Sequence, residues 1–248
     1  MRANFRVAVS ILAAAGAISL SGCAATQVAL EHKNMDVQTK MSNTVFLTPV
    51  PPAEQTVYIQ FKNTSDKTLD VSALEQEIDA NLANQGYRVV PYQQAHYMLQ
   101  INVLSVGKSS PSAAQEALGG GYGGTLGSAI AGAAAGGVIG QSYVGAGVGG
   151  LVAGVGGFVA DSLVKNVTYD MVTDVQIGER SKSVVNQQTN ANLQQGTSTT
   201  TTQQTSSSGH WIYYRTRIVS TANKVNLDFK TALPALQGQL VHSLSGIV

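Results

Sequence analysis

Charged side chains and cysteine are both scarce in this chain of 248 residues. Lys and Arg total 15, Asp and Glu total 14, and together they make up 12% of the sequence, about half of the usual share in soluble proteins. The formal net charge of +1 gives no broad electrostatic attraction to nucleic acid. The single cysteine excludes an internal disulfide framework. A low-charge chain with 26 glycines indicates contact with a membrane, assembly with other copies, or both.

The motifs that usually mark an enzyme are also missing. The four histidines are scattered without the spacing of a metal site, and there is no HExxH, GxSxG or P-loop pattern. Two stretches, 119–124 and 145–150, match GxGxxG. Neither follows a clear strand, and no acidic residue lies at the right distance to hold a ribose, so the glycine content alone explains them. We therefore expect no enzymatic activity, no metal and no non-covalent cofactor.

A few side chains could still form a site, and each has a simpler structural explanation. Asp170 and Asp174 lie four residues apart in a strand pattern. We interpret them as part of a solvated sheet face rather than as a catalytic pair. His96 is expected at the solvent or the sheet surface. An aromatic cluster is predicted to pack on the sheet, with an exposed binding role as the alternative; it comprises Trp211, Tyr213 and Tyr214.

The first 22 residues have the parts of a secretory signal peptide. Arg2 and Arg6 supply positive charge, and residues 7–20 form an uncharged apolar core that is too short to span a bilayer comfortably. The stretch Leu20–Cys23 then resembles the bacterial lipobox, with small residues directly before the cysteine. The alternative is an ordinary signal peptide that happens to end near a cysteine.

The lipobox predicts cleavage before Cys23 and covalent lipid on that residue. Its thiol is the nucleophile that accepts a diacylglycerol, and the new N-terminus receives an N-palmitoyl chain. Three acyl chains give effectively permanent anchoring. Residue 24 is Ala, whereas Asp at this position is the usual signal for retention in the inner membrane. We therefore expect a lipid-anchored protein of the outer membrane.

Residues 23–116 are predicted to form the N-terminal half of an α+β domain. The segment 24–40 is polar and is expected to form a short helix near the membrane, before prolines at 49, 51 and 52 break regular structure. Alternating residues predict strands at 57–62, 87–90 and 97–103. A capping box at Ser72–Glu75 predicts a helix that ends near Gly86 and has one apolar face, formed by Leu74, Ile78 and Leu82.

Residues 161–248 are predicted to supply the C-terminal half of the same domain. Residues 167–177 alternate strongly as a strand, and the flanks 183–193 and 211–220 are expected to pair as a hairpin. The Ser/Thr/Gln-rich tract 194–209 between them is predicted to be a mobile loop. Pro234 is expected to begin a last helix, whose apolar face comprises Leu236, Leu240 and Leu244.

The segment 117–160 contains no Asp, Glu, Lys or Arg and is rich in Gly, Ala and aliphatic residues. We predict an inserted hydrophobic helical hairpin in the membrane or in an oligomer core, because small residues let helices approach closely where lipid enforces helical structure. A flexible glycine linker and a buried soluble hairpin are the alternatives. The small-residue positions predicted to pack are Gly123, Gly127, Gly132, Gly136, Gly140, Gly145, Gly149, Gly150 and Gly154.

The chain resembles the TraT family of outer-membrane lipoproteins over its whole mature length. The segments that carry the resemblance are the lipobox Leu20–Cys23, the central Gly/Ala hairpin, and the stretches 61–67, 171–180 and 214–227. The resemblance implies surface exclusion, in which a cell carrying the protein is a poor recipient for a related conjugative plasmid. It also implies complement resistance and a surface-exposed homo-oligomer. The partners implied are donor-cell conjugation components and complement components, besides the lipid of the outer membrane.

Two other functions remain open from the residues alone. One is a structural envelope lipoprotein whose oligomer occupies or seals membrane without any exclusion activity. The other is an oligomeric membrane pore built from the hairpins. An uncharged small-residue hairpin offers no obvious polar lumen, which counts against the pore.

Overall fold

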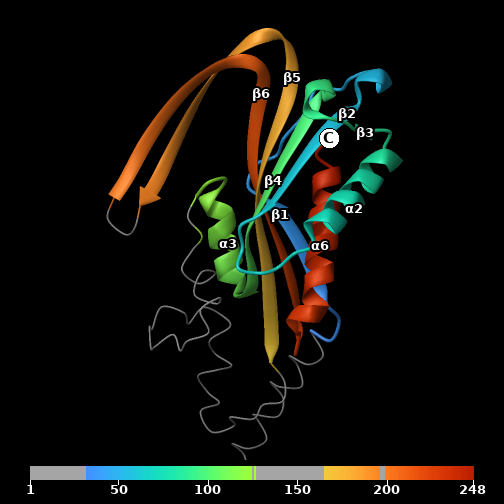
Figure 1. Ribbon diagram of the computed structural model, residues 1–248. Coiled ribbons are helices and arrows are strands. Elements are labelled where there is room, and N and C mark those ends of the chain that lie inside the picture. Colours follow the sequence, from blue (N-terminus) through green and yellow to red (C-terminus); the bar gives the residue numbers. More distant parts are fainter. Residues whose placement is uncertain (1–31, 125, 127–164, 196–198) are drawn as a thin grey trace, which may run out of the picture. The chain divides into compact units, whose positions relative to one another are not determined.

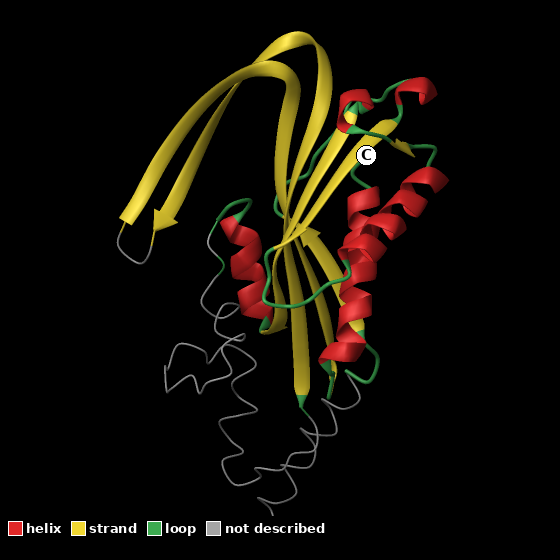
Figure 2. Ribbon diagram, in the orientation of Figure 1, coloured by secondary structure: helices red, strands yellow, loops and turns green. Residues whose placement is uncertain are grey.

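The computed structural model describes residues 32–124, 126, 165–195 and 199–248, and it is an α+β protein built on one six-stranded sheet (Figure 1, Figure 2). The predicted signal peptide, Cys23 and most of the glycine-rich segment lie outside the described residues. The strands are β1 (Asp36–Met41), β2 (Thr56–Asn63), β3 (Arg88–Val89), β4 (Tyr97–Ser109), β5 (Asn166–Gln195) and β6 (Thr199–Val225). The helices are α2 (Val71–Asn84), α3 (Pro111–Gly120) and α6 (Phe229–Ser245), with short 3-10 turns at Pro52–Glu54 and Tyr92–Gln94.

The strand order is β1-β6-β5-β4-β2-β3. β2 pairs in parallel with β3 and with β4, whereas β4 pairs antiparallel with β5. The two central neighbours, β4 and β5, come from opposite sides of the glycine-rich segment in the sequence. The prediction that both halves of the chain contribute to one sheet is therefore confirmed.

Helix α2 begins and ends at residues that suit helix termini. The Asp70 carboxylate accepts the Ala73 backbone N–H at 3.0 Å and caps the helix, so the cap lies two residues before the predicted Ser72. Gly86 follows the C-cap with a φ of +92°, which glycine adopts without strain. The predicted apolar face is confirmed, because its three residues are buried: Leu74, Ile78 and Leu82.

Helix α6 packs beside α2 on one face of the sheet, and it begins earlier than expected. Its first residue is Phe229, so Pro234 lies inside the helix at its sixth position rather than at its start. Only the first four backbone N–H groups of a helix lack a helical acceptor, so proline at this position removes one hydrogen bond from the helix. The predicted apolar face is confirmed, with its residues buried in the core: Leu236, Leu240 and Leu244.

Both faces of β5 are covered over its first half. Tyr169 contacts Phe229 of α6 on one face, with ring centroids 5.7 Å apart. On the other face, Val172 of β5 and Val219 of β6 pack against an alanine surface of α3, formed by Ala113, Ala114 and Ala117. α3 was not predicted from the sequence, and its C-terminal end was expected to belong to the glycine-rich insertion. The helix instead continues from Pro111 to Gly120 as a cover of the sheet.

Two other sequence-based predictions are wrong. Residues 36–40, expected within a helix, belong to the edge strand β1. The tract 194–209, expected to be a loop, extends β5 to Gln195 and begins β6 at Thr199, and only 196–198 fall outside the described residues. β-branched threonine favours extended backbone, and the adjacent strands β5 and β6 use this tract as the end of a long two-stranded ribbon (Figure 1).

The chain divides into two compact units. The larger comprises Val37–Gly140, Thr168–Ala222 and Phe229–Val248, and it holds the helices and most of the sheet. In the described part of the smaller unit, the Lys165 N–H donates to the Asn226 side chain at 2.9 Å, and the Asn226 N–H donates back to the Lys165 carbonyl at 2.7 Å.

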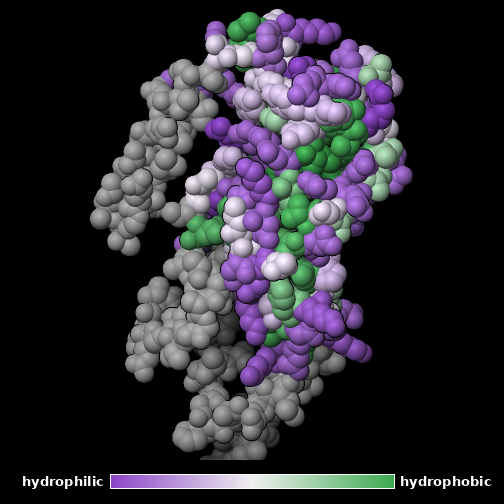
Figure 3. Space-filling view, in the orientation of Figure 1, coloured by the Kyte–Doolittle hydropathy of each residue, from purple (hydrophilic) through white to green (hydrophobic). Residues whose placement is uncertain are grey.

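Hydrophilic side chains cover much of the face seen in Figure 3, with hydrophobic ones between them. The large hydrophobic side chains that are exposed are scattered along the described chain: Met41, Phe46, Val89, Tyr92, Tyr122 and Val184. Among the helices that the structure describes, none combines the length and the apolar character needed to cross a membrane.

Candidate functional site

A buried ion pair lies under the C-terminal end of α3. Arg217 of β6 donates from Nε to Asp174 Oδ1 at 2.7 Å and from a terminal nitrogen to Asp174 Oδ2 at 3.1 Å. The Arg217 side chain is fully buried and that of Asp174 is 9% exposed. The prediction of a solvated face around Asp174 is therefore wrong, because α3 covers it. A buried charge pair of this kind requires further hydrogen bonds to offset the loss of hydration.

Those hydrogen bonds come from the backbone where the chain leaves α3. Arg217 donates to the carbonyl oxygens of Ala117 at 3.2 Å and Gly124 at 2.9 Å, and the Gly123 N–H donates to Asp174 Oδ2 at 2.8 Å. We call this group the polar centre: Asp174, Arg217 and the turn 121–124. It fixes the point at which the chain departs from the sheet and enters the glycine-rich segment.

The turn of the polar centre requires glycine for two separate reasons. Gly123 has a φ of +69°, a left-handed conformation that most side chains disfavour. At Gly124 a Cβ atom would lie 2.0 Å from the Gly120 carbonyl oxygen, which no side chain tolerates. Both glycines therefore allow the chain to turn at the end of α3 and to contact the ion pair with its backbone.

Gly123 is the one described member of the predicted packing set. The structure gives its N–H a role within the subunit, and its packing against a second copy stays a prediction. The other predicted site residues lie outside the described residues: Cys23, Gly127, Gly132, Gly136, Gly140, Gly145, Gly149, Gly150 and Gly154.

The sequence does contain a local signal for α3, although the helix was not predicted. Ser110 caps the helix by accepting the Ala113 N–H at 3.2 Å, and Pro111 occupies the first helical position. Serine followed by proline is a common helix start. Recognition of this start would have predicted a helix from Pro111, although not which face of the sheet it covers. No local signal identifies Arg217 as its partner, because the two residues are 43 positions apart.

Asp170 lies on the same face of β5 and is 1% exposed. Neither of its carboxylate oxygens has a hydrogen-bond partner within normal distance in the part of the chain that the structure describes. Burial raises the pKa of the Asp170 carboxyl to about 7, and the Ser109 hydroxyl opposes the shift only in part. The prediction of solvated carboxylates is wrong here too. Asp170 is a buried acid that holds its proton up to about neutral pH.

Four polar side chains, three glutamine amides and one arginine, form a row across four strands of the sheet. Gln100 donates to Gln60 at 2.8 Å, Gln176 donates to Gln100 at 2.7 Å, and Arg215 donates to Gln176 at 2.8 Å. The three glutamines are register partners on β2, β4 and β5. Each amide can both donate and accept, so the row satisfies itself and ties the strands together.

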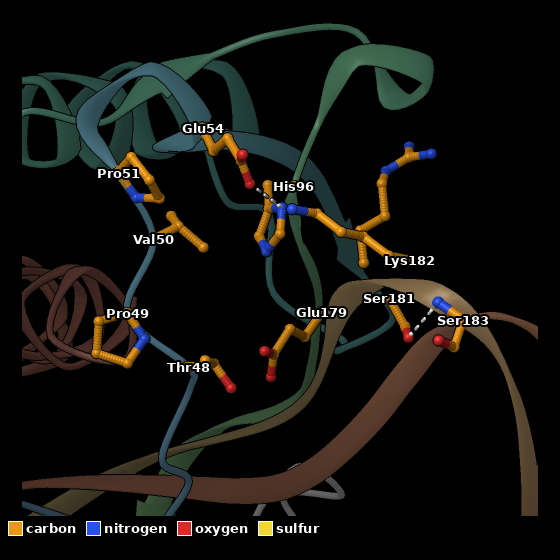
Figure 4. Close-up of a pocket in the computed structure, with 11 residues that line it drawn as sticks. Thr48, Pro49, Val50, Pro51, Glu54, His96, Glu179, Ser181, Lys182 and Ser183 are labelled. Carbon is orange, nitrogen blue, oxygen red and sulfur yellow. Dashed lines mark hydrogen bonds and ion pairs between the residues drawn. The ribbon is translucent and has the colours of Figure 1, made fainter.

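A cavity of about 410 Å³ lies where β4 begins and β5 continues past it (Figure 4). Its lining combines a proline-rich segment with the start of the ribbon and includes five ionisable side chains. The residues are Thr48, Pro49, Val50, Pro51, Glu54, His96, Glu179, Arg180, Ser181, Lys182 and Ser183. His96 is half-buried and lies 3.7 Å from the Glu54 carboxylate, rather than facing open solvent. Figure 4 shows Glu179 extending into the hollow.

Two tyrosines donate hydrogen bonds to residues that line this cavity. Tyr97 donates its hydroxyl to the Thr48 carbonyl oxygen, and burial raises the pKa of Tyr97 to about 12, so the donor stays protonated. Tyr214 donates to Glu179 Oε2 at 3.2 Å. Burial also raises the pKa of Tyr214, and the adjacent Glu179 charge adds to the effect. Tyr214 thus supports Glu179 of the cavity lining rather than an aromatic stack.

Trp211 packs in the way that the sequence predicted. Its ring stacks on Tyr92 with centroids 5.4 Å apart, and the Arg180 guanidinium lies 4.6 Å from the indole centroid. Arg180 also donates to three carbonyl oxygens, those of Tyr92, Gln93 and Ala95. These contacts fix the position of the Arg180 guanidinium, which keeps its positive charge because its acceptors are neutral. Among the described residues, no group of three acidic, histidine or cysteine side chains is placed to hold a metal ion.

These features define an α+β protein with one mixed sheet, helices on both of its faces and a long uncharged segment that leaves from a buried polar centre. Within that class the chain belongs to the TraT family, described as "Enterobacterial TraT complement resistance protein", which matches residues 34–248. It is 42% identical over 249 residues to a TraT complement resistance protein of Escherichia coli, covering all of both chains. A second relative, from Wigglesworthia glossinidia brevipalpis, is 26% identical over 92% of this chain and 91% of its own.

Among solved structures, a PelC dodecamer from Paraburkholderia phytofirmans aligns with 56% of this chain and 68% of its own at 8% identity. The TM-score is 0.22, which is too low to carry an argument about fold or assembly.

Proposed function

We propose that this protein is a lipid-anchored outer-membrane protein that protects the cell against complement and blocks entry of related conjugative plasmids. It acts as a homo-oligomer and not as an enzyme. The observation that carries the proposal is the 42% identity, end to end, with a relative named for complement resistance. The similarity extends over all of this chain and all of that relative.

The lipobox Leu20–Cys23 supports the location. Removal of the first 22 residues leaves Cys23 as the N-terminal residue, with lipid on its thiol and its amino group. Such an anchor holds the sheet domain within reach of whatever approaches the cell surface. Complement components and the conjugation surface components of a donor cell are the proposed partners, and both act at that surface.

Loss of the anchor is expected to abolish the function. A Cys23→Ser variant cannot accept diacylglycerol, so it should remain unprocessed or leave the membrane fraction. We expect cells with the wild-type gene to survive serum and to receive a related conjugative plasmid poorly. Cells with the variant should match an empty vector in both assays.

A matched Ser72→Ala variant, at an exposed position of α2, keeps the lipobox intact and serves as the control for expression. Protection by Cys23→Ser equal to the wild type would contradict the anchored model of action. Serum protection without any effect on mating would retain complement resistance and remove surface exclusion from the proposal.

The two-stranded ribbon supports the proposed homo-oligomer. β4 pairs with β5 only as far as Glu179, so no described strand covers that edge of β5 from Ser181 onward. From Ser181 to Tyr214, Lys182 is the only Asp, Glu, Lys or Arg. Uncharged open edges favour pairing with further strands, and an isolated two-stranded ribbon is only marginally stable in water. Pairing between copies would satisfy these edges.

The glycine-rich segment gives a second test of the oligomer. Gly136→Leu places bulk on the predicted packing face and should dissociate the oligomer while lipidation continues. Gly136→Asp should dissociate it further, since burial of an unpaired carboxylate costs several kcal/mol. Native electrophoresis after mild detergent extraction measures both. Unchanged assembly in both variants would favour an exposed linker over a packed hairpin.

A further inference from the structure

We propose that the cavity around Glu179 binds a basic side chain, the ammonium of lysine or the guanidinium of arginine, carried by an extended peptide segment. This inference goes beyond the proposed function, because it names a ligand for a cavity in the sheet domain. It uses the β5 edge only from Ser181 to Ser183 and leaves the edge from Val184 onward for the proposed pairing between copies.

The first support is a buried acid that lacks a cation. Glu179 is 5% exposed, and the ion pairs of the described residues do not include it. Among the described residues, its carboxylate accepts a hydrogen bond only from the neutral hydroxyl of Tyr214, at 3.2 Å. Buried carboxylates are normally paired with a positive group, because a single neutral donor does not replace lost hydration. The cavity gives the missing cation access to Glu179 (Figure 4).

The second support is the charge of the cavity lining. The lining carries two acids, Glu54 and Glu179, and two bases, Arg180 and Lys182. Neither base forms an ion pair with Glu179 in the part of the chain that the structure describes. Arg180 is held by three carbonyl oxygens and the Trp211 ring, and Lys182 is exposed. The position beside the Glu179 carboxylate therefore still favours a positive group.

The third support identifies the carrier as an extended peptide. One wall of the cavity is β5 from Ser181 to Ser183, directly past the point where β4 stops pairing with it. An extended segment laid along this edge continues the sheet in place of β4 and bonds through its own backbone. The opposite wall carries Pro49 and Pro51, which have no backbone N–H to compete for those bonds. A volume of about 410 Å³ admits more than one side chain.

The test is calorimetric titration of the full-length protein in detergent with acetylated, amidated pentapeptides. The central residue of the peptide is lysine, arginine or norleucine, and the four flanking residues are the same in all three. We expect the lysine and arginine peptides to bind and the norleucine peptide not to bind. Equal binding of the norleucine peptide would overturn the proposal, since norleucine has the length of lysine without its charge.

Two variants separate charge from folding. Glu179→Gln keeps an acceptor for Tyr214 and should weaken the lysine peptide by at least about tenfold, as expected for one partner of a buried charge pair. Glu77→Gln, on the exposed side of α2, is the matched control and should bind as the wild type does. Wild-type affinity in Glu179→Gln would overturn the proposal.

Lys182→Glu tests the same charge argument at an exposed position that folding does not require. It removes the competing cation and adds an acid, so the lysine peptide should bind a few-fold more tightly. Weaker or unchanged binding would overturn the proposal even if Glu179→Gln failed to fold. n-Butylammonium serves as the last probe. Affinity equal to that of the lysine peptide would overturn the role of the β5 edge.

Discussion

Replacement of Arg217 by Met is expected to lower the free energy of unfolding by about 3–5 kcal/mol, because it leaves the Asp174 carboxylate buried without its cation. Only the Gly123 N–H would remain as a donor among the contacts of the polar centre. The carbonyl oxygens of Ala117 and Gly124 would lose their donors as well. Urea unfolding followed by circular dichroism measures the loss, with Arg88→Met as an exposed arginine control.

The double variant Arg217→Met, Asp174→Leu separates the ion pair from the packing around it. An apolar pair of similar volume often matches a buried ion pair in stability, so the double variant should recover much of what the single variant loses. The Gly123 N–H and the two carbonyl oxygens would still lack partners, which prevents full recovery. A single variant as stable as the wild type would show that the pair contributes nothing to the fold.

Replacement of Asp170 by Asn is expected to remove a strong dependence of stability on pH. The folded pKa of Asp170 is about 7 and the ordinary value is 3.8, so between these values the folded protein keeps a proton that the unfolded chain releases. Stability of the wild type therefore falls as the pH rises from about 4 to about 7, by on the order of 3–4 kcal/mol. The variant carries no ionisable group there and should lack this fall.

Thermal unfolding at a series of pH values measures this difference between the wild type and Asp170→Asn. Asp79→Asn, on the exposed side of α2, is the control and should keep the pH dependence of the wild type. Parallel curves for all three proteins would show that Asp170 is ionised in the folded state across this range.

The parts of the fold that the sequence predicted well rest on local periodicity. Leu74, Ile78 and Leu82 recur at helical spacing, and apolar residues occupy every second position of 167–177 except Thr173. Each pattern identified one face that packs in the core, and that information lies within one segment. The shared sheet also followed from the sequence, because neither half supplied enough strands to close its own edges.

The errors arose where a distant segment changed the environment of a residue. Asp170 and Asp174 alternate with apolar residues as a solvated face would, but α3 covers that face. Their burial depends on a helix that lies on the other side of the glycine-rich segment in the sequence and, for Asp174, on Arg217 in the next strand. The prediction of a loop at 194–209 was wrong for another reason. Its composition was interpreted as disorder, whereas its threonines also fit an extended strand.

The polar centre determines how mechanical load enters the domain. A pull on the chain at residue 125 reaches Gly124 and Gly123 before it reaches α3, and both are held by charge-assisted hydrogen bonds. Asp174 and Arg217 pass that load to β5 and β6, two adjacent strands inside the sheet. Force from the glycine-rich segment is thus borne by the sheet itself, and the end of α3 does not have to unwind first.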